Sequence, residues 1–162
     1  MIRPMQSTDV PRVAEIHVFA QRAAYRGFVP DDFLFGDKMT VEKRIKYFAD
    51  RHSMGYVYDV GFIKAFVTMG CCQDDDKPSS FEIFRIFVDQ FFAREGIGKN
   101  MAKFCEEVAA ERGFREICLW ALEGNTKAAA FYEKIGYIPD GVRRISGFFH
   151  VPELRYVKEI RK

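Results

Sequence analysis

The apolar positions along the chain follow two spacings, one typical of helices and one typical of strands. Repeats at intervals of three and four residues predict helices, and short runs rich in β-branched and aromatic residues predict strands. Helices are therefore expected at residues 10–24, 41–48, 97–112 and 127–135. Strands are expected at residues 2–5, 56–60, 62–69, 81–88, 117–122, 137–145 and 153–160. Between them, Ser7, Thr8 and Asp9 are N-cap candidates for the first helix, and residues 25–34 are expected to form turns.

The order of these elements predicts an α/β fold built on one mixed sheet. The helix at 97–112 connects the strands at 81–88 and 117–122, and such a crossover makes the two strands a right-handed parallel pair. Hairpins impose antiparallel pairing elsewhere. No internal repeat or linker interrupts the 162 residues, so we expect a single domain, 1–162.

Composition and charge exclude several classes of protein. Hydrophobic residues make up 48% of the chain, which argues against a disordered protein. The 25 basic and 23 acidic residues nearly balance, so nucleic acid is not an expected partner. The N-terminal segment is polar and no apolar run approaches the length of a membrane span, so we expect a cytoplasmic protein without a signal peptide or membrane contact. Three aspartates at 74–76 predict a solvated loop, with attraction of a cationic substrate as the alternative.

The four cysteines do not form a recognisable metal-binding motif. Cys71, Cys72, Cys105 and Cys118 include no C-x-x-C pair, and none of the three histidines lies near a cysteine in the sequence. We therefore expect no metal site, and we predict free thiols in a reducing compartment. An acyl-cysteine intermediate at Cys71 or Cys72 is not expected either, because nothing nearby in the sequence supplies a base.

The stretch from Ser80 to Lys99 carries the main chemical signal. A buried strand leads through a loop into a helix that starts at Gly96-Ile97-Gly98. Glycines let the backbone approach a ligand, and the free N–H groups and the positive end of the helix dipole suit a phosphate. A plain turn is the alternative. The spacing fits neither the P-loop nor the dinucleotide fingerprint, whose third small residue is replaced here by Met101.

Two motifs can be compared with a known family once the element order is in hand. The first is EIFRIFVDQFFAREGIGKNM, and the second, which is more specific, is LWALEGNTKAAAFYEKIGY. Both resemble motifs of the GNAT superfamily of acyl-CoA-dependent N-acetyltransferases. The first resembles the family's central strand followed by [QR]-x-x-G-x-[GA]. The second resembles its strand, Asn turn and A-x-x-F-Y-E-K-x-G-[FY] helix. The resemblance implies a mostly antiparallel sheet with helices on both faces, whose one parallel pair splays apart at the cofactor site. One departure is Ala93, which stands at the family's Gln/Arg position.

The resemblance implies that the cofactor is acetyl-CoA and that no metal takes part. The pyrophosphate would lie on the backbone amides of Arg94, Glu95, Gly96, Ile97, Gly98 and Lys99, and the pantetheine arm would pair with the strand edge at Phe87 and Val88. Asn125 and Ala128, at the start of the next helix, would also reach the cofactor. An Asn at this position is equally an ordinary helix cap. Arg94 or Lys99 would substitute for the missing Gln/Arg side chain.

The resemblance further implies direct transfer of the acetyl group to an amine within a ternary complex. Tyr132 would donate a proton to the departing thiolate, a backbone N–H near Val88 would polarise the carbonyl, and Glu82 would deprotonate the amine directly or through water. The alternatives are a core aromatic for Tyr132 and, for Glu82, a solvated strand end or an ion pair with Arg85. A non-catalytic acyl-CoA-binding or regulatory module and a protein-interaction domain are the competing functions.

The sequence does not identify the acceptor amine. In this fold the acceptor site is built mainly by residues 20–51 and the last two strands, where Tyr25, Phe28 and Phe33 could line it or belong to the core. Small amines, polyamines, antibiotics and protein N-termini are all left open as acceptors, and so is a homodimer.

Overall fold

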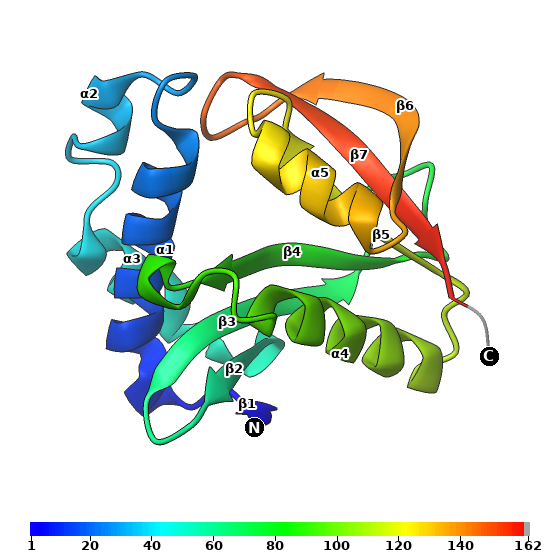
Figure 1. Cartoon of the computed structure of the whole chain (residues 1–162), viewed down its shortest axis with the longest axis horizontal. Helices are drawn as coiled ribbons and strands as arrows, with labels where there is room; N and C mark the ends of the chain where they lie inside the picture. The colour runs from blue at the N-terminus through cyan, green and yellow to red at the C-terminus, as the bar shows by residue number, and fades with distance from the viewer. Residues whose placement is uncertain (161–162) are drawn as a thin grey trace. The chain divides into compact units, whose positions relative to one another are not determined.

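The computed structural model describes residues 1–160 and contains seven strands and five α-helices in that range (Figure 1). The strands are β1 (Ile2–Pro4), β2 (Gly55–Asp59), β3 (Ile63–Cys71), β4 (Phe81–Val88), β5 (Glu116–Leu122), β6 (Ile138–Ile145) and β7 (Pro152–Glu159). The helices are α1 (Val10–Tyr25), α2 (Asp31–Leu34), α3 (Val41–Ala49), α4 (Ile97–Glu111) and α5 (Thr126–Lys134). Among these helices, none has both the length and the apolar composition that crossing a bilayer requires.

The strands form one mixed sheet in the order β1-β2-β3-β4-β5-β7-β6. Strands β4 and β5 run parallel, while β2–β3, β5–β7 and β6–β7 run antiparallel. The parallel ladder is short, because its registered pairs extend only from Phe81 opposite Ile117 to Ile83 opposite Leu119. The predicted fold class, an α/β fold with a mixed and mostly antiparallel sheet that contains one parallel pair, is confirmed.

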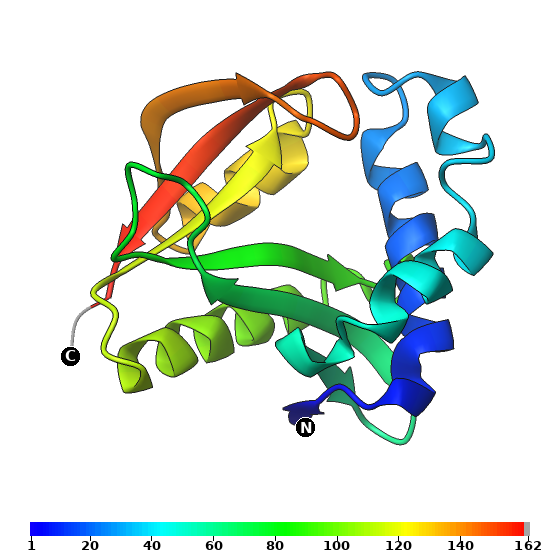
Figure 2. The same ribbon diagram turned by 180° about the vertical axis from the view of Figure 1, so that it is seen from behind.

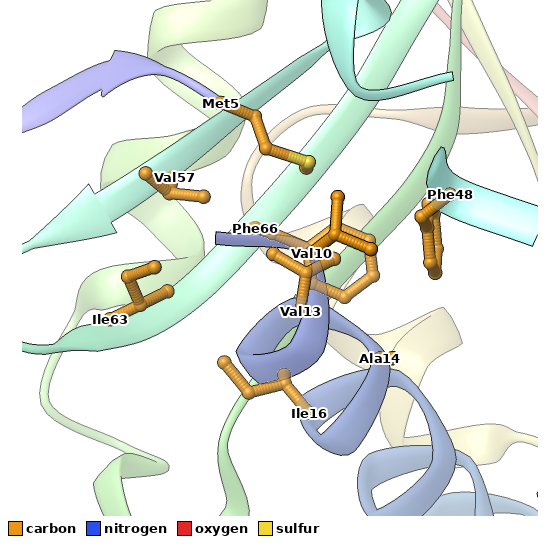
Figure 3. Packing of buried hydrophobic residues seen from close by; sticks show 9 residues of the cluster. All are labelled: Met5, Val10, Val13, Ala14, Ile16, Phe48, Val57, Ile63 and Phe66. Carbon is orange, nitrogen blue, oxygen red and sulfur yellow. The ribbon is translucent and has the colours of Figure 1, made fainter. Parts of the chain in front are cut away.

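The chain divides into two compact units, of which the first comprises Met1–Thr68 and Arg85–Ala102. Its core lies between helices α1 and α3 and the β2–β3 hairpin, and Figures 2 and 3 show the helices and the core cluster. The buried residues of this cluster are Met5, Val10, Val13, Ala14, Ile16, Phe48, Val57, Ile63 and Phe66. The spacing of three between Val10, Val13 and Ile16 places all three on the inward face of α1, as the sequence predicts.

The second unit comprises Met69–Phe84 and the chain from Lys103 onward. Here α5 packs on β7, since the ring centroids of Tyr132 and Tyr156 lie 6.0 Å apart. Lys158 of β7 links two helices, because its Nζ donates to the Glu106 carboxylate at 2.8 Å and to the Ile135 carbonyl at 2.9 Å. These contacts hold α5 and the second half of α4 against the strands of this unit.

One local prediction is wrong, and a second is confirmed only in part. Residues 31–34, expected within a turn, form the short helix α2, because the Pro30 carbonyl accepts from the N–H groups of Phe33 and Leu34. Asp9 is the N-cap residue of α1, as predicted, but its side chain makes no capping hydrogen bond to this helix. Its carboxylate instead accepts from the Gln6 N–H at 2.8 Å and pairs with Arg3 at 2.7 Å.

The acidic loop at residues 73–79 is mostly exposed, as the sequence predicts, but two of its three aspartates are held in ion pairs. Asp74, Asp76 and Asp140 all pair with Arg155, whose side chain on β7 is only 2% exposed. Asp74 also accepts from the Trp120 indole N–H at 3.0 Å and pairs with Arg144 at 3.0 Å. Arg144 and Arg155 thus neutralise Asp74 and Asp76, and these ion pairs hold the loop in place.

Candidate active site

The strand-to-helix junction after β4 is anchored on both sides within the first unit. At the end of β4 the Asp89 N–H donates to the Lys64 carbonyl at 2.8 Å. The Asp89 side chain is buried, accepts from the Phe91 N–H at 3.0 Å and pairs with Arg12 of α1. These bonds fix the end of the strand and start the 3₁₀ turn Gln90–Phe92 that leads into the loop.

The loop itself turns back sharply into α4. Two of its residues, Arg94 (φ +69°) and Gly96 (φ +81°), lie in the left-handed region that favours glycine. Glu95 between them pairs with Lys64 at 3.1 Å, which ties the loop to β3. Arg94, Gly96 and Lys99 are exposed, whereas Ile97 is buried and anchors the first turn of the helix.

This geometry leaves a set of backbone donors at the start of α4. The first helical bond runs from the Asn100 N–H to the Gly96 carbonyl, at 3.1 Å. The amides of Ile97, Gly98 and Lys99 therefore precede the intrahelical bonding and need outside acceptors. Together with the positive end of the helix dipole, they can hold an anion such as a phosphate.

Phe87 and Val88 lie at the end of β4 that leads into this loop. The ring of Phe87 packs against His17, with centroids 5.1 Å apart, and stacks on Phe66 at 5.8 Å. Its half-buried side chain therefore packs against the core of the first unit. Val88 is half-buried.

Asn125 and Ala128 lie at the start of α5 in the second unit. The side-chain oxygen of Asn125 accepts from the Ala128 N–H at 3.1 Å, so Asn125 is the N-cap of this helix. The helix-cap interpretation of Asn125 is confirmed, and its side-chain NH₂ group is the part with which it could also contact a ligand. Ala128 is half-buried, and its amide is used by the cap.

Tyr132 is buried on α5 in an aromatic group. Its ring centroid lies 5.3 Å from that of Phe131 and 6.0 Å from those of Tyr137 and Tyr156. These contacts fix the orientation of the phenol ring. A fixed ring is expected both for a core aromatic and for a positioned proton donor. The packing therefore does not choose between the two roles.

Glu82 is the second residue of β4 and is 7% exposed. Its Oε2 accepts from the Gln73 N–H at 3.2 Å. Burial raises the pKa of this carboxyl above its ordinary value, and the hydrogen bond from Gln73 offsets part of the rise. Arg85, three residues along the strand, points to the opposite face and lies over the ring of Tyr47. A buried carboxyl with a raised pKa suits proton transfer near neutral pH better than a solvated strand end would.

The structure also brings together residues that the sequence analysis treated as unrelated. The thiols of Cys72 and Cys118 lie 3.4 Å apart, next to the Glu82 carboxylate. Burial raises the pKa of both thiols, which disfavours the thiolate and an acyl-cysteine intermediate. The parallel register of β4 and β5 sets Glu82 beside Cys118. No motif in the sequence encodes this register, so the sequence gives no signal for the cluster.

Comparison with known proteins gives consistent results. A model of the acetyltransferase (GNAT) family matches residues 22–137. An uncharacterised N-acetyltransferase of Methanocaldococcus jannaschii is 33% identical over 140 residues, which are 84% of this chain but only 59% of that protein. Another, from Bacillus subtilis, is 23% identical over 148 residues, or 87% of this chain and 80% of that protein.

Solved structures share the fold at low sequence identity. PaiA N-acetyltransferase from Thermoplasma acidophilum, in complex with coenzyme A, superposes with a TM-score of 0.77 at 16% identity over 98% of both chains. YncA from Salmonella typhimurium, with its cofactor acetyl-CoA, gives 0.71 at 12% identity over 100% of this chain and 94% of that one. The family model covers more than half of the residues, and the chain therefore belongs to the acetyltransferase (GNAT) family.

Proposed function

We infer that this chain transfers an acetyl group from acetyl-CoA to an amine. The observation that carries this inference is the junction between β4 and α4, where Arg94 and Gly96 have positive φ and the first amides of the helix precede its intrahelical hydrogen bonds. Family membership supports the reaction class, and the CoA and acetyl-CoA in the PaiA and YncA structures support the cofactor.

In the proposed complex the pyrophosphate of acetyl-CoA accepts hydrogen bonds from the amides between Arg94 and Lys99. Charged acceptors strengthen such bonds, and the dipole of α4 adds to them. Ala93 at the family's Gln/Arg position removes one side chain but none of these amides, and the exposed Arg94 and Lys99 bring positive charge to the same loop. The pantetheine arm would pair with the backbone at Phe87 and Val88.

The proposed reaction is direct attack of the amine on the thioester carbonyl. Glu82 takes the proton that the amine loses, and a backbone N–H near Val88 donates to the oxyanion of the tetrahedral intermediate. The C–N bond forms, the C–S bond breaks, and Tyr132 supplies a proton to the departing thiolate. Asn125 and Ala128 are proposed to contact the cofactor from the start of α5.

Free thiol released from acetyl-CoA in the presence of a panel of amines tests this proposal. We expect thiol release that depends on both acetyl-CoA and at least one amine, with the acetylated amine as the second product. The panel should include small amines, polyamines, antibiotics with free amines and peptides with free N-termini, which are the acceptor classes that the sequence leaves open.

A second candidate function is a non-catalytic module that binds acyl-CoA. The departure at Ala93 favours it, because the site lacks a side chain that relatives supply at the loop. Binding of CoA in a calorimeter without thiol release from any amine of the panel would support this alternative over acetyl transfer. Absence of CoA binding would exclude both functions.

A further inference from the structure

Three potential metal ligands converge in the second unit. The side chains of Cys72, Glu82 and Cys118 each offer one ligand atom, and these atoms all lie within 4.8 Å of one another. The two sulfur atoms are 3.4 Å apart. Cys118 and Glu82 are buried, whereas Cys72 is half-buried. This cluster is not part of the cofactor loop described above.

The fold, not sequence proximity, creates this cluster. In the parallel ladder Glu82 of β4 lies directly opposite Cys118 of β5, so their side chains point to the same face. Cys72 follows β3 and is brought back by a hydrogen bond from its N–H to the Ser80 carbonyl, at 2.9 Å. Three separate segments thus each contribute one ligand.

We propose that Cys72, Glu82 and Cys118 bind a zinc ion. Tetrahedral zinc with Zn–S bonds of about 2.3 Å places two sulfur ligands about 3.8 Å apart, which a small rotation of either side chain reaches from the observed separation. Zinc binding displaces the protons of the two thiols, and the resulting thiolates select a soft cation over Mg²⁺ or Ca²⁺. A carboxylate is an accepted third ligand. The fourth position is left to water or another small ligand, as in zinc sites with three protein ligands.

The surroundings hold the ligands in place. The Gln73 N–H donates to Glu82 Oε2 at 3.2 Å. The loop that carries this donor is itself held in place, because Asp74 and Asp76 pair with the buried Arg155 at 3.0 and 2.5 Å. Hydrogen bonds to a ligand atom orient it and raise metal affinity. Cys72 and the exposed residues on either side of it give an ion access from solvent.

Cobalt serves as a spectroscopic probe of this site, used with the full chain after reduction and removal of metals. We expect one Co²⁺ per chain, an intense thiolate-to-cobalt charge-transfer band, and displacement of the cobalt by zinc. Cys72→Ser and Cys118→Ser should each weaken cobalt binding by more than about 100-fold, because loss of a ligand costs more than loss of a hydrogen bond to a ligand. Each should also reduce the charge-transfer band.

Two other cysteines provide matched controls. Cys71→Ser changes the exposed neighbour of Cys72, and Cys105→Ser changes a buried thiol on α4, so neither should alter cobalt binding. Cys72 is half-buried, and its serine variant tests the site even if the Cys118 variant does not fold. A spectrum without the charge-transfer band would overturn the proposal, as would a band that survives Cys72→Ser. A third outcome would also overturn it: a Cys72–Cys118 disulfide forms in air, and the reduced protein takes up no cobalt. Because the readout is metal binding, its result does not depend on acetyl transfer.

Discussion

Substitution of Gly96 by valine separates a role in cofactor binding from a role in folding. Gly96 has a φ of +81°, and a Cβ added there would meet no atom within 4 Å, so the substitution adds backbone strain but no collision. An L-residue in the left-handed region costs about 1–2 kcal/mol, and a β-branched residue lies at the upper end of this range.

Gly113 offers a control with the same strain. It follows α4 at the other end of the helix, has a φ of +85°, and also has no atom within 4 Å of an added Cβ. Gly96→Val and Gly113→Val should therefore lower the free energy of unfolding by similar amounts, about 1–2 kcal/mol. For a chain of this length that corresponds to a loss of roughly 2–8 °C in Tm, measured by calorimetry.

The two variants should differ in their affinity for CoA. A hydrogen bond to a charged group contributes about 1.5–3 kcal/mol, so displacing one pyrophosphate oxygen from the amides after Gly96 raises the Kd about 10- to 150-fold. Gly113→Val leaves these amides unchanged, and its Kd should stay within about twofold of the parent value. Isothermal titration with CoA measures both constants. Equal CoA affinity of the two variants would refute the assignment of the pyrophosphate to this junction.

Three further predictions concern the remaining residues. Tyr132→Phe should lower kcat about ten- to a thousandfold with little change in acetyl-CoA affinity, whereas parental kcat with reduced thermal stability would make Tyr132 only a core aromatic. Glu82→Gln should lower the rate about 10²- to 10⁴-fold and flatten the acidic limb of the pH profile. In the parent, the midpoint of that limb should lie above the pKa of an ordinary Glu, because burial raises the pKa of Glu82. Since the folded-state pKa of Glu82 lies above the unfolded value, the free energy of unfolding should fall as pH rises through it, and the Gln variant should lack this fall in urea titrations at several pH values. Arg155→Met should lower the free energy of unfolding in urea by about 3 kcal/mol, because Asp74 and Asp140, each less than 15% exposed, lose their buried partner. A loss under about 1 kcal/mol would show that the cluster contributes little to stability.

The elements near the proposed cofactor site could be predicted because their signals are local. A continuous apolar run predicts β4 with its observed bounds, Phe81–Val88, and the two glycines after it mark the start of α4 within one residue. Asn125 is likewise predicted and observed at the start of α5, where its side chain satisfies a free amide. Helix α2 escaped prediction because Pro30, a turn signal, here precedes a helix.

The contacts that sequence reasoning missed all depend on strand register. The cations that neutralise the acidic loop come from Arg144 and Arg155, which lie 70 and 79 or more residues further along the chain. In the same way, 46 residues separate Cys72 from Cys118, and no short motif connects them. A charge run or an isolated cysteine has a clear meaning only when its partner across the sheet is known, and a single sequence does not specify that partner.

Glu82 is both the proposed general base and a proposed zinc ligand, and it cannot serve in both roles at the same time. A general base needs a free lone pair on its carboxylate, whereas a carboxylate bound to zinc has given that lone pair to the metal. A chain with zinc at Cys72, Glu82 and Cys118 would therefore lack its proposed base, while its cofactor loop around Gly96 would be unchanged. Zinc should then lower kcat without raising the Kd for CoA, and it should have no such effect on a Cys72→Ser variant that retains turnover. This consequence rests on the proposed base role of Glu82: if zinc binds to the cluster but turnover is unaffected, the metal site stands and the proton of the amine leaves by another route.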